Sequence, residues 1–409
     1  MNSASTRKAS TLIRSIALSV FVLASVVLLT PVPALAYPKV RLTNLTKYVA
    51  SGEVNYPGCR NDRFSGLQPG QTWIPGPARG GCLITWISAS LSGGPGVNRY
   101  TSSGTSYSEF FISPSGSGYQ VFSSHEDPTA NRAQPEVVNK PFFNIAHMVT
   151  TDAAVDWALS RGANGLEMDM HFHPDGRPWE FRHGGVCDCV CSAFEGGDHV
   201  CNLVGCETRA QLEPHLRHIA IKSSQVAMII IDSKVDKDSL SQAAQRVAGA
   251  AVVQLLEQQL FSRGYVGFAV ISAPEWNYSA YLLAAADQAN KSLYKSQLYV
   301  GVDMDNGGTD GARATLQHLW RDVGTSNVVY GSGISACLSG TFYAETMLAG
   351  LAEAQGRVRL VDIWTLDKAA SMRKYIWLGA RGILTNEPGV LAGVATQMNM
   401  TLARPGYRP

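Results

Sequence analysis

Charged residues are scarce in this chain, and neither sign is in excess. Only 16% of its 409 residues are Asp, Glu, Lys or Arg, with 34 basic residues against 32 acidic ones. A disordered chain would need the opposite balance, whereas 45% apolar residues are typical of a globular protein. The lack of a basic excess gives no sign of a nucleic-acid partner. At roughly 150 residues per domain, the length allows two or three domains.

Long apolar runs are also missing, except near the N-terminus. Arg7, Lys8 and Arg14 accompany the apolar run Ile16–Leu29, and the small residues Ala34 and Ala36 follow it. This order is typical of a secretory signal peptide, so we predict that residues 1–36 are removed and that the mature protein is secreted and extracellular. A membrane anchor is the alternative, but the run is short for a span and a cleavage signal follows it.

Eight cysteines in a secreted chain indicate disulfide bonds. Cys59 and Cys82 are the only cysteines before residue 130, so we expect them to pair with each other. Five more lie together from Cys187 to Cys206, and Cys337 stands alone downstream. The spacing does not decide how these six pair, and a zinc site in the cluster is the alternative to disulfides.

Residues 37–130 have the pattern of a small all-β domain. Short runs rich in β-forming residues alternate with clusters of Gly, Pro and Ser, and no long helical period appears. We expect strands at Val40–Leu45, Gly52–Tyr56, Cys82–Leu91, Ser108–Ile112 and Tyr119–Ser123. A β-sandwich held by the Cys59–Cys82 bond is therefore predicted. A linker is expected after it, at residues 131–139.

Residues 140–409 alternate between apolar strands and helical segments. The strands are expected at Phe142–Val149, Gly165–His171, Val226–Asp232, Gly264–Ser272, Gln297–Asp303, Asn327–Tyr330, Val358–Trp364 and Gly382–Thr385. The helices include Asp152–Ser160, Ser239–Phe261, Ala312–Asp322 and Lys368–Leu378. Eight strand–helix units predict an α/β protein with a (β/α)8 TIM barrel. A doubly wound open sheet is the alternative, but no glycine-rich phosphate loop follows the first strand.

Polar residues stand at or just beyond the carboxyl ends of these strands, where barrel enzymes keep their active sites. They are His147, Glu167, Asp169, His183, Asp232, Lys234, Trp364 and Asn386. Glu167 and Asp169 are two residues apart and point to one face, toward which Asp232 is also expected to point. Three carboxylates this close demand a hard cation, so we predict one Mg²⁺ ion, with Ca²⁺ as the second choice. Any one of these residues, taken alone, could instead be a helix cap or turn residue.

Lys234 and the histidines complete the predicted chemistry. Lys234 would neutralise part of the acidic charge and help to attract one phosphodiester anion. Cleavage of a phosphodiester needs a base or nucleophile on one side of the phosphorus and an acid on the leaving oxygen. His147 and His183 titrate near neutral pH and are the candidates for these roles. His171 and His173 are expected to support the site or face solvent, because a hard cation prefers oxygen ligands.

These residues lie in stretches that resemble a known family: the sphingomyelinase D or phospholipase D toxins of spider venoms and their bacterial and fungal relatives. The stretches are residues 146–149, 162–169, 183–189, 231–234, 363–368 and 384–388. The most specific one is the His-Gly-x-x-Cys-Asp-Cys element from His183 to Cys189. Order and spacing agree over residues 140–395, which is nearly the whole predicted barrel.

The resemblance implies a role for each polar residue. His147 would be the nucleophile or base and His183 the general acid. The metal ligands would be Glu167, Asp169 and Asp232; Lys234 would contact the phosphate; Trp364 and Asn386 would line the substrate site. Cys189 would pair with Cys337. The family often has an aromatic residue two positions before the tryptophan, where this chain has Asp362.

The resemblance also implies a reaction. The family releases choline or ethanolamine from sphingolipids or lysophospholipids, and the lipid's own hydroxyl attacks to leave a cyclic phosphate. The partner would be a phospholipid or sphingolipid at a membrane surface, and we expect a monomer. The β-rich domain has no counterpart in the venom enzymes, and a contact with glycans or membranes is one role for it.

Two other functions are alternatives. A glycerophosphodiester phosphodiesterase uses the same barrel, and Glu167-x-Asp169-x-His171 resembles its pattern. However, that family usually has His-Arg where this chain has His147-Met148, and it lacks the Cys-Asp-Cys element. The other alternative is a secreted glycan- or membrane-binding protein with an inactive barrel, whose binding surface would include the turn-rich stretch Tyr100–Tyr107. The presence of every acid and base favours an enzyme.

Overall fold

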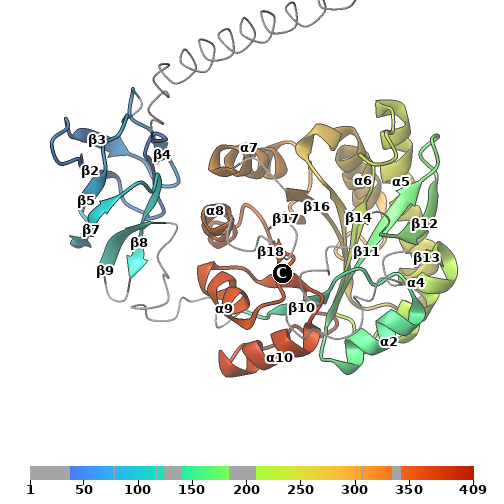
Figure 1. The fold of residues 1–409 in the computed structure, drawn as a ribbon. Helices are drawn as coiled ribbons and strands as arrows, with labels where there is room; N and C mark the ends of the chain where they lie inside the picture. Colours follow the sequence, from blue (N-terminus) through green and yellow to red (C-terminus); the bar gives the residue numbers. More distant parts are fainter. Residues whose placement is uncertain are drawn as a thin grey trace, which may run out of the picture.

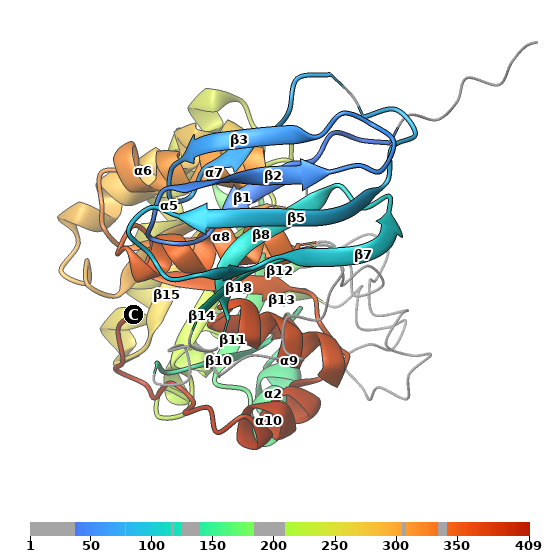
Figure 2. The same cartoon turned by 90° about the vertical axis from the view of Figure 1, so that its left-hand side faces the viewer.

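The computed structural model describes residues 37–77, 79–115, 118–123, 140–183, 209–304, 308–333 and 342–409. They form a β-sandwich and a barrel ringed by helices (Figure 1, Figure 2). The expected boundaries at residues 36, 130 and 139 fall outside these ranges, so the signal peptide and the linker stay predictions. Within the described ranges, no helix combines the length and the apolar character that a membrane span requires.

Two sheets pack face to face in the N-terminal region. One has the strand order β4-β1-β8-β9-β6 and the other β3-β2-β5-β7. The strands are β1 (Arg41–Asn44), β2 (Ala50–Asn55), β3 (Asp62–Leu67), β4 (Thr72–Trp73), β5 (Ile84–Leu91), β6 (Val97–Asn98), β7 (Tyr100–Thr105), β8 (Glu109–Ser115) and β9 (Gly118–Ser123). Residues from both sheets, such as Val54, Ile87 and Phe110, are fully buried in one core. A disulfide joins Cys59 and Cys82, as predicted.

Most of the stretch Tyr100–Tyr107, which was described above as turn-rich, forms strand β7, which pairs with β5. A contact of this domain with glycans or membranes stays a prediction. Tyr100 points inward, is 5% exposed and packs against Phe110. Within β7 only Tyr100 and Thr105, at its two ends, are buried.

All eight predicted barrel strands are present and run parallel. They are β10 (Phe143–Ala146), β11 (Gly165–Phe172), β14 (Met228–Ser233), β15 (Phe268–Ala273), β16 (Leu298–Met304), β17 (Val328–Gly333), β18 (Leu360–Trp364) and β19 (Gly382–Thr385). Neighbouring strands pair in the order β10-β19-β18-β17-β16-β15-β14-β11, and pairing of β10 with β11 closes the ring. The predicted (β/α)8 barrel is therefore confirmed. The hairpin strands β12 (Pro178–Arg182) and β13 (Arg209–Gln211) extend the sheet beside β11.

Helices cover the outside of the barrel. They are α2 (Asp152–Ser160), α4 (Leu212–Ile221), α5 (Gln242–Gln259), α6 (Ser279–Lys291), α7 (Gly308–Arg321), α8 (Tyr343–Ala354), α9 (Ala369–Leu378) and α10 (Pro388–Gln397). Short 3-10 turns, η3 (Phe261–Arg263) and η4 (Trp276–Tyr278), flank β15. Helix α5 begins later than predicted because the Ser241 side chain caps it by accepting from the Ala244 amide.

Strand alternation divides the barrel's apolar residues between two cores. One core fills the barrel interior and includes Met228, Ile230 and Leu360, whereas the other lies between strands and helices and includes Ile229 and Ile231. A residue two positions after an interior residue also faces the interior. The interior sides of β10, β11, β14, β18 and β19 therefore lead, at the carboxyl end, to polar positions predicted from the sequence.

The opposite end of the barrel is closed by the C-terminal segment. Ala403 and Tyr407 belong to the interior core, and the Tyr407 ring lies 6.2 Å from that of Phe143. The carboxyl ends of the strands are thus the end at which a substrate can enter.

The β-sandwich rests on helices α7 and α8. Arg41 of β1 bonds the Thr309 hydroxyl at 2.5 Å and the Asp310 carboxylate at 3.2 Å. In the reverse direction, Arg313 of α7 donates to the Gly70 carbonyl and to the Thr72 hydroxyl. The two parts are joined by direct hydrogen bonds as well as by the chain.

Candidate active site

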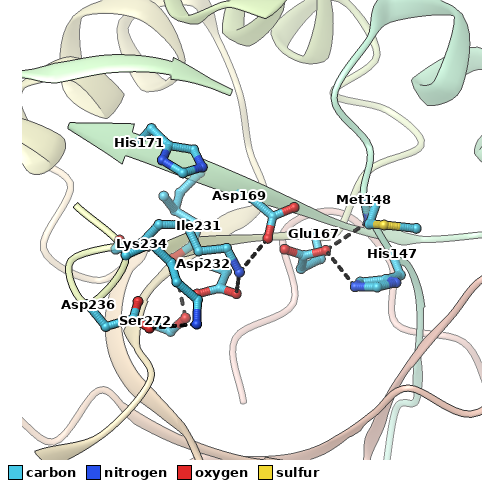
Figure 3. A network of polar contacts seen from close by, with 12 residues as sticks. His147, Met148, Glu167, Asp169, His171, Ile231, Asp232, Lys234, Asp236 and Ser272 are labelled. Carbon is cyan, nitrogen blue, oxygen red and sulfur yellow. Dashed lines mark hydrogen bonds and ion pairs between the residues drawn. The ribbon is translucent and has the colours of Figure 1, made fainter. Parts of the chain in front are cut away.

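Three carboxylates meet at the carboxyl ends of strands β11 and β14. Asp169 and Asp232 are directly paired in the parallel register, and Glu167 precedes Asp169 by two positions. One oxygen of each lies within 4.8 Å of the others (Figure 3). Glu167 and Asp169 are almost fully buried, with 2% and 1% exposure. Strand parity therefore correctly predicted that these residues form one cluster, which could hold a metal ion.

Lys234 neutralises part of this cluster. Its Nζ lies 2.6 Å from an Asp169 oxygen and 2.5 Å from an Asp232 oxygen. Burial raises the pKa of Glu167 well above its usual value, and the nearby Asp169 charge raises it further. Burial also disfavours the charged form of Asp169, but Lys234, His183 and His147 together outweigh it and lower the pKa of that carboxyl.

The donor set fits a hard cation. Glu167 Oε1 and Asp169 Oδ2 are buried without a hydrogen-bond partner among the residues that the structure describes. Buried carboxylate oxygens in that state carry a desolvation cost that a bound cation would offset. Oxygen-only ligands suit Mg²⁺ or Ca²⁺ better than a softer transition metal.

A hydrogen-bonded chain holds His147 against the cluster. His147 Nδ1 lies 2.9 Å from Asn386 Oδ1, and Asn386 Nδ2 donates to Asp367 at 2.9 Å. Because the amide nitrogen faces Asp367, the amide oxygen faces the imidazole and accepts its Nδ1–H. The lone pair of the neutral ring is then on Nε2, which lies 3.9 Å from Glu167.

The backbone beside His147 is shaped by the same carboxylate. Met148 has a φ of 56°, which is unusual for a residue with a side chain. Its amide donates to Glu167 Oε2 at 2.8 Å. Glu167 thus fixes the turn that presents His147, in addition to its place in the acidic cluster.

His183 follows the hairpin strand β12 and approaches from the neighbouring element. Its ring centroid lies 5.7 Å from that of His147, with the two rings nearly perpendicular. It is close enough to Asp169 to contribute to the lowering of that pKa. The structure therefore brings together the two histidines that the sequence analysis selected from different strand ends.

The other predicted residues occupy distinct places. Trp364 ends β18 on the interior face, and Asn386 lies beside His147, 2% exposed, so it orients that ring. His171 bonds Asp238 at 2.9 Å, whereas His173 stacks on Trp179. Cys189 and Cys337 lie outside the described residues, so their disulfide stays a prediction.

Sequence reasoning missed three interior acids. Asp367 lies within a stretch that carried the resemblance, but it was given no role. Its carboxylate accepts hydrogen bonds from the backbone N–H and from the side-chain Nδ2 of Asn386. Asp303 and Asp362 were drawn within strands and not selected, although both are interior positions near the carboxyl ends. Burial, with the charge of Asp232, raises the pKa of Asp303 to about 7.

The fold and site define a class before any relative is considered. A (β/α)8 barrel whose mouth combines a carboxylate cluster, a lysine and two facing histidines is a phosphodiesterase-type enzyme.

Residues 138–404 match the family model described as dermonecrotic toxin SPH, and the chain belongs to this family. The resemblance drawn from the sequence is thereby confirmed. Dermonecrotic toxin LiSicTox-betaID1 of Loxosceles intermedia is 27% identical over 272 residues, covering 63% of this chain and 83% of the toxin. Dermonecrotic toxin Hl-PLD1 of Hemiscorpius lepturus is 26% identical over 271 residues, covering 64% of this chain and 81% of that toxin. A putative glycerophosphoryl diester phosphodiesterase of Silicibacter pomeroyi has a TM-score of 0.47 at 14% identity, covering 65% of this chain and 98% of that one.

Proposed function

We propose that the protein is a secreted, Mg²⁺-dependent phospholipase D of the sphingomyelinase D type. It would remove the headgroup from sphingolipids or lysophospholipids by intramolecular transphosphatidylation, leaving a cyclic phosphate. One observation carries this proposal: His147 is held by Asn386 and Asp367 so that its Nε2 faces the carboxylate cluster. A structural histidine would not need a fixed tautomer aimed at three acids.

The cluster supplies the binding site for the ion and the phosphate. Glu167, Asp169 and Asp232 would hold Mg²⁺, which when bound polarises a phosphoryl oxygen. Lys234, already within 2.6 Å of Asp169 and of Asp232, would turn its third N–H donor to the phosphate. The phosphodiester would then lie beside both imidazoles.

The two histidines would move the protons. His147 Nε2 takes the proton of the lipid's free hydroxyl, whose oxygen forms a new bond to phosphorus. The bond from phosphorus to the headgroup oxygen breaks, and His183 gives that oxygen its proton. The imidazolium formed at His147 keeps its Nδ1–H bond to Asn386, and the Asp367 carboxylate behind Asn386 stabilises the positive charge.

Mass spectrometry of the products from a mixed lipid panel tests this proposal. The panel contains sphingomyelin, lysophosphatidylcholine, lysophosphatidylethanolamine and glycerophosphocholine, each incubated with the protein and Mg²⁺. We expect free headgroup together with a lipid phosphate one water lighter than the linear phosphate. Preferential cleavage of glycerophosphocholine would instead support a glycerophosphodiester phosphodiesterase.

A matched pair of histidine variants serves as the control for that assay. His147→Ala removes the proposed base, whereas His318→Ala removes a partly exposed histidine of α7 that pairs with Asp322 and stacks on Trp276. The proposal requires that the first variant loses product formation and the second retains it. Absence of any cleaved lipid with the unaltered protein would favour the inactive-barrel alternative.

A further inference from the structure

A second pair of acids lies in the barrel interior, apart from the carboxylate cluster. Asp303 of β16, Gly331 of β17 and Asp362 of β18 stand side by side in the parallel register. A Cβ atom at Gly331 would lie 2.0 Å from Asp303 Oδ1 and 2.7 Å from Asp362 Oδ1. The two carboxyl groups therefore converge over the glycine, which alone among residue types leaves them room.

One member of this pair, Asp362, lacks the partners that buried acids normally have. Asp362 is 0% exposed, and neither of its oxygens has a hydrogen-bond partner in the described ranges. Asp303 accepts from the Ser272 side chain. Burial and the neighbouring Asp303 raise the pKa of Asp362 well above its usual value. Two acids this close cannot both ionise unless a cation joins them.

The pair lies next to the proposed reaction centre. Asp232 of the carboxylate cluster is in register with Ser272 of β15, which donates to Asp303. The Asp232 charge is close enough to raise the pKa of Asp303. Asp303 is therefore the member of the pair that lies nearer to the carboxylate cluster.

An aromatic side chain borders the same space on the side of the mouth. Trp364 follows Asp362 by two positions and so faces the interior as well. Its ring covers Gly333, where a Cβ atom would lie 2.8 Å from the indole Cγ. Two acids and one indole thus lie on the interior faces of β16 and β18, the strands on either side of β17.

We propose that Asp303, Asp362 and Trp364 form the headgroup subsite and select a primary ammonium, as in an ethanolamine headgroup, over a quaternary one. This inference rests on the proposed function and names its substrate class. A primary ammonium carries three N–H donors, which match the unpartnered oxygens of Asp362 and the Asp303 carboxylate. A trimethylammonium has none and would leave these oxygens unsatisfied. The indole face attracts either cation, so the acids decide the preference.

The kinetic test compares three lysophospholipids with the same acyl chain and ethanolamine, choline or glycerol as the headgroup. We expect the protein to have its highest kcat/KM on the ethanolamine lipid. In Asp362→Asn, the ratio of kcat/KM for the ethanolamine lipid to that for the glycerol lipid should fall about 10- to 100-fold, the range for a charge-assisted hydrogen bond. Asp303→Asn should change the ratio in the same direction. The matched control is Asp287→Asn, at an exposed acid on α6.

Several results would overturn the subsite. An unchanged ratio in Asp362→Asn, a choline preference in the unaltered protein, or an equal loss on all three lipids would each do so. Misfolding is checked by the melting temperature, which should not fall, because the substitution removes an unpaired buried carboxyl group.

Equilibrium binding separates this inference from the proposed function. Calorimetric titration with phosphoethanolamine and with phosphocholine, both with Mg²⁺, needs no turnover. We expect phosphoethanolamine to bind more tightly and Asp362→Asn to remove the difference. If no lipid is cleaved but this difference is found, the subsite stands and the proposed function fails. Equal binding of both probes overturns the subsite.

Discussion

Replacement of Lys234 by Met tests whether the carboxylate cluster is built for a cation. The Lys234 side chain is 17% exposed, and its Nζ contacts Asp169 and Asp232 at 2.6 and 2.5 Å. Methionine keeps much of the side-chain volume but removes the positive charge. In the variant, the carboxylates of Asp169 and Asp232 would face each other and Glu167 without the positive charge of the lysine.

The size of the effect follows from the burial of the partners. Removal of one member of a buried ion pair costs about 3–5 kcal/mol, because the other member stays buried and uncompensated. Asp232 is 23% exposed at its side chain, so the lower end of that range, about 3 kcal/mol, is expected. At about 2–4 °C per kcal/mol for a domain of this size, the melting temperature should fall by roughly 6–12 °C in the presence of a chelator.

The distinguishing measurement is the response to Mg²⁺. Differential scanning fluorimetry is run for the unaltered protein and for Lys234→Met, each with a chelator and with excess Mg²⁺. Because the variant's cluster is more negative, Mg²⁺ should raise its melting temperature more than that of the unaltered protein. Lys291→Met, which breaks an exposed pair with Asp287, is the control and should change the melting temperature little. An equal Mg²⁺ response in the two proteins would refute the cation site.

Four further outcomes are expected. In steady-state assays, His147→Ala and His183→Ala should each lower turnover about 10²- to 10⁴-fold. The double variant should be little worse than either single variant, because the two histidines act as a unit. Independent losses that multiply in the double variant would contradict this. Chelation should abolish activity and added Mg²⁺ restore it, whereas full turnover in excess chelator would exclude a metal-dependent reaction. Burial raises the pKa of Glu345 to about 7, so the ionisation of this carboxyl group opposes folding increasingly as the pH rises from 4.5 to 7. Glu345→Gln should therefore leave the free energy of unfolding unchanged at pH 4 and raise it by about 3 kcal/mol at pH 8. Urea titration at the two pH values measures this difference. Cys59→Ser opens a loop of 23 residues and should cost about 3 kcal/mol, measured in the same way without reductant; a loss below about 1 kcal/mol would mean that the bond adds little.

The barrel and the acidic cluster were predictable because both depend on local patterns. Each strand is an apolar run bounded by turn residues, and alternation along a strand sets which side chains face the interior. That alternation was enough to place Glu167, Asp169 and Asp232 together. The predicted strand from Gly264 began too early, since the chain first closes the turn η3 and β15 starts at Phe268.

Features that depend on distant pairing were not predictable. Strand β13 has three residues and pairs with β12 across a long intervening segment, so no local pattern marks it. The role of Asn386 likewise depends on Asp367, which fixes the orientation of its amide and thereby the tautomer of His147. The sequence shows an amide near a strand end, but only the hydrogen-bond network shows which of its atoms faces the imidazole.

The acid pair of the barrel interior shows the same limit most clearly. Asp303 is the last but one residue of β16 and Asp362 is the middle residue of β18, and neither stands out from its strand alone. The register of the three strands brings the two acids together, because it places Gly331 between them and a glycine has no side chain to separate the carboxyl groups. Alternation within one strand places the residues of the carboxylate cluster, whereas the alignment of three strands brings the two carboxyl groups of the acid pair together. Substrate preference in this barrel should therefore respond to a side chain at Gly331. Gly331→Ala should reduce kcat/KM on the ethanolamine lipid far more than on the glycerol lipid, because the added methyl group would displace both carboxyl groups at once. Equal losses on the two lipids, in the same assay, would show that the glycine serves packing alone.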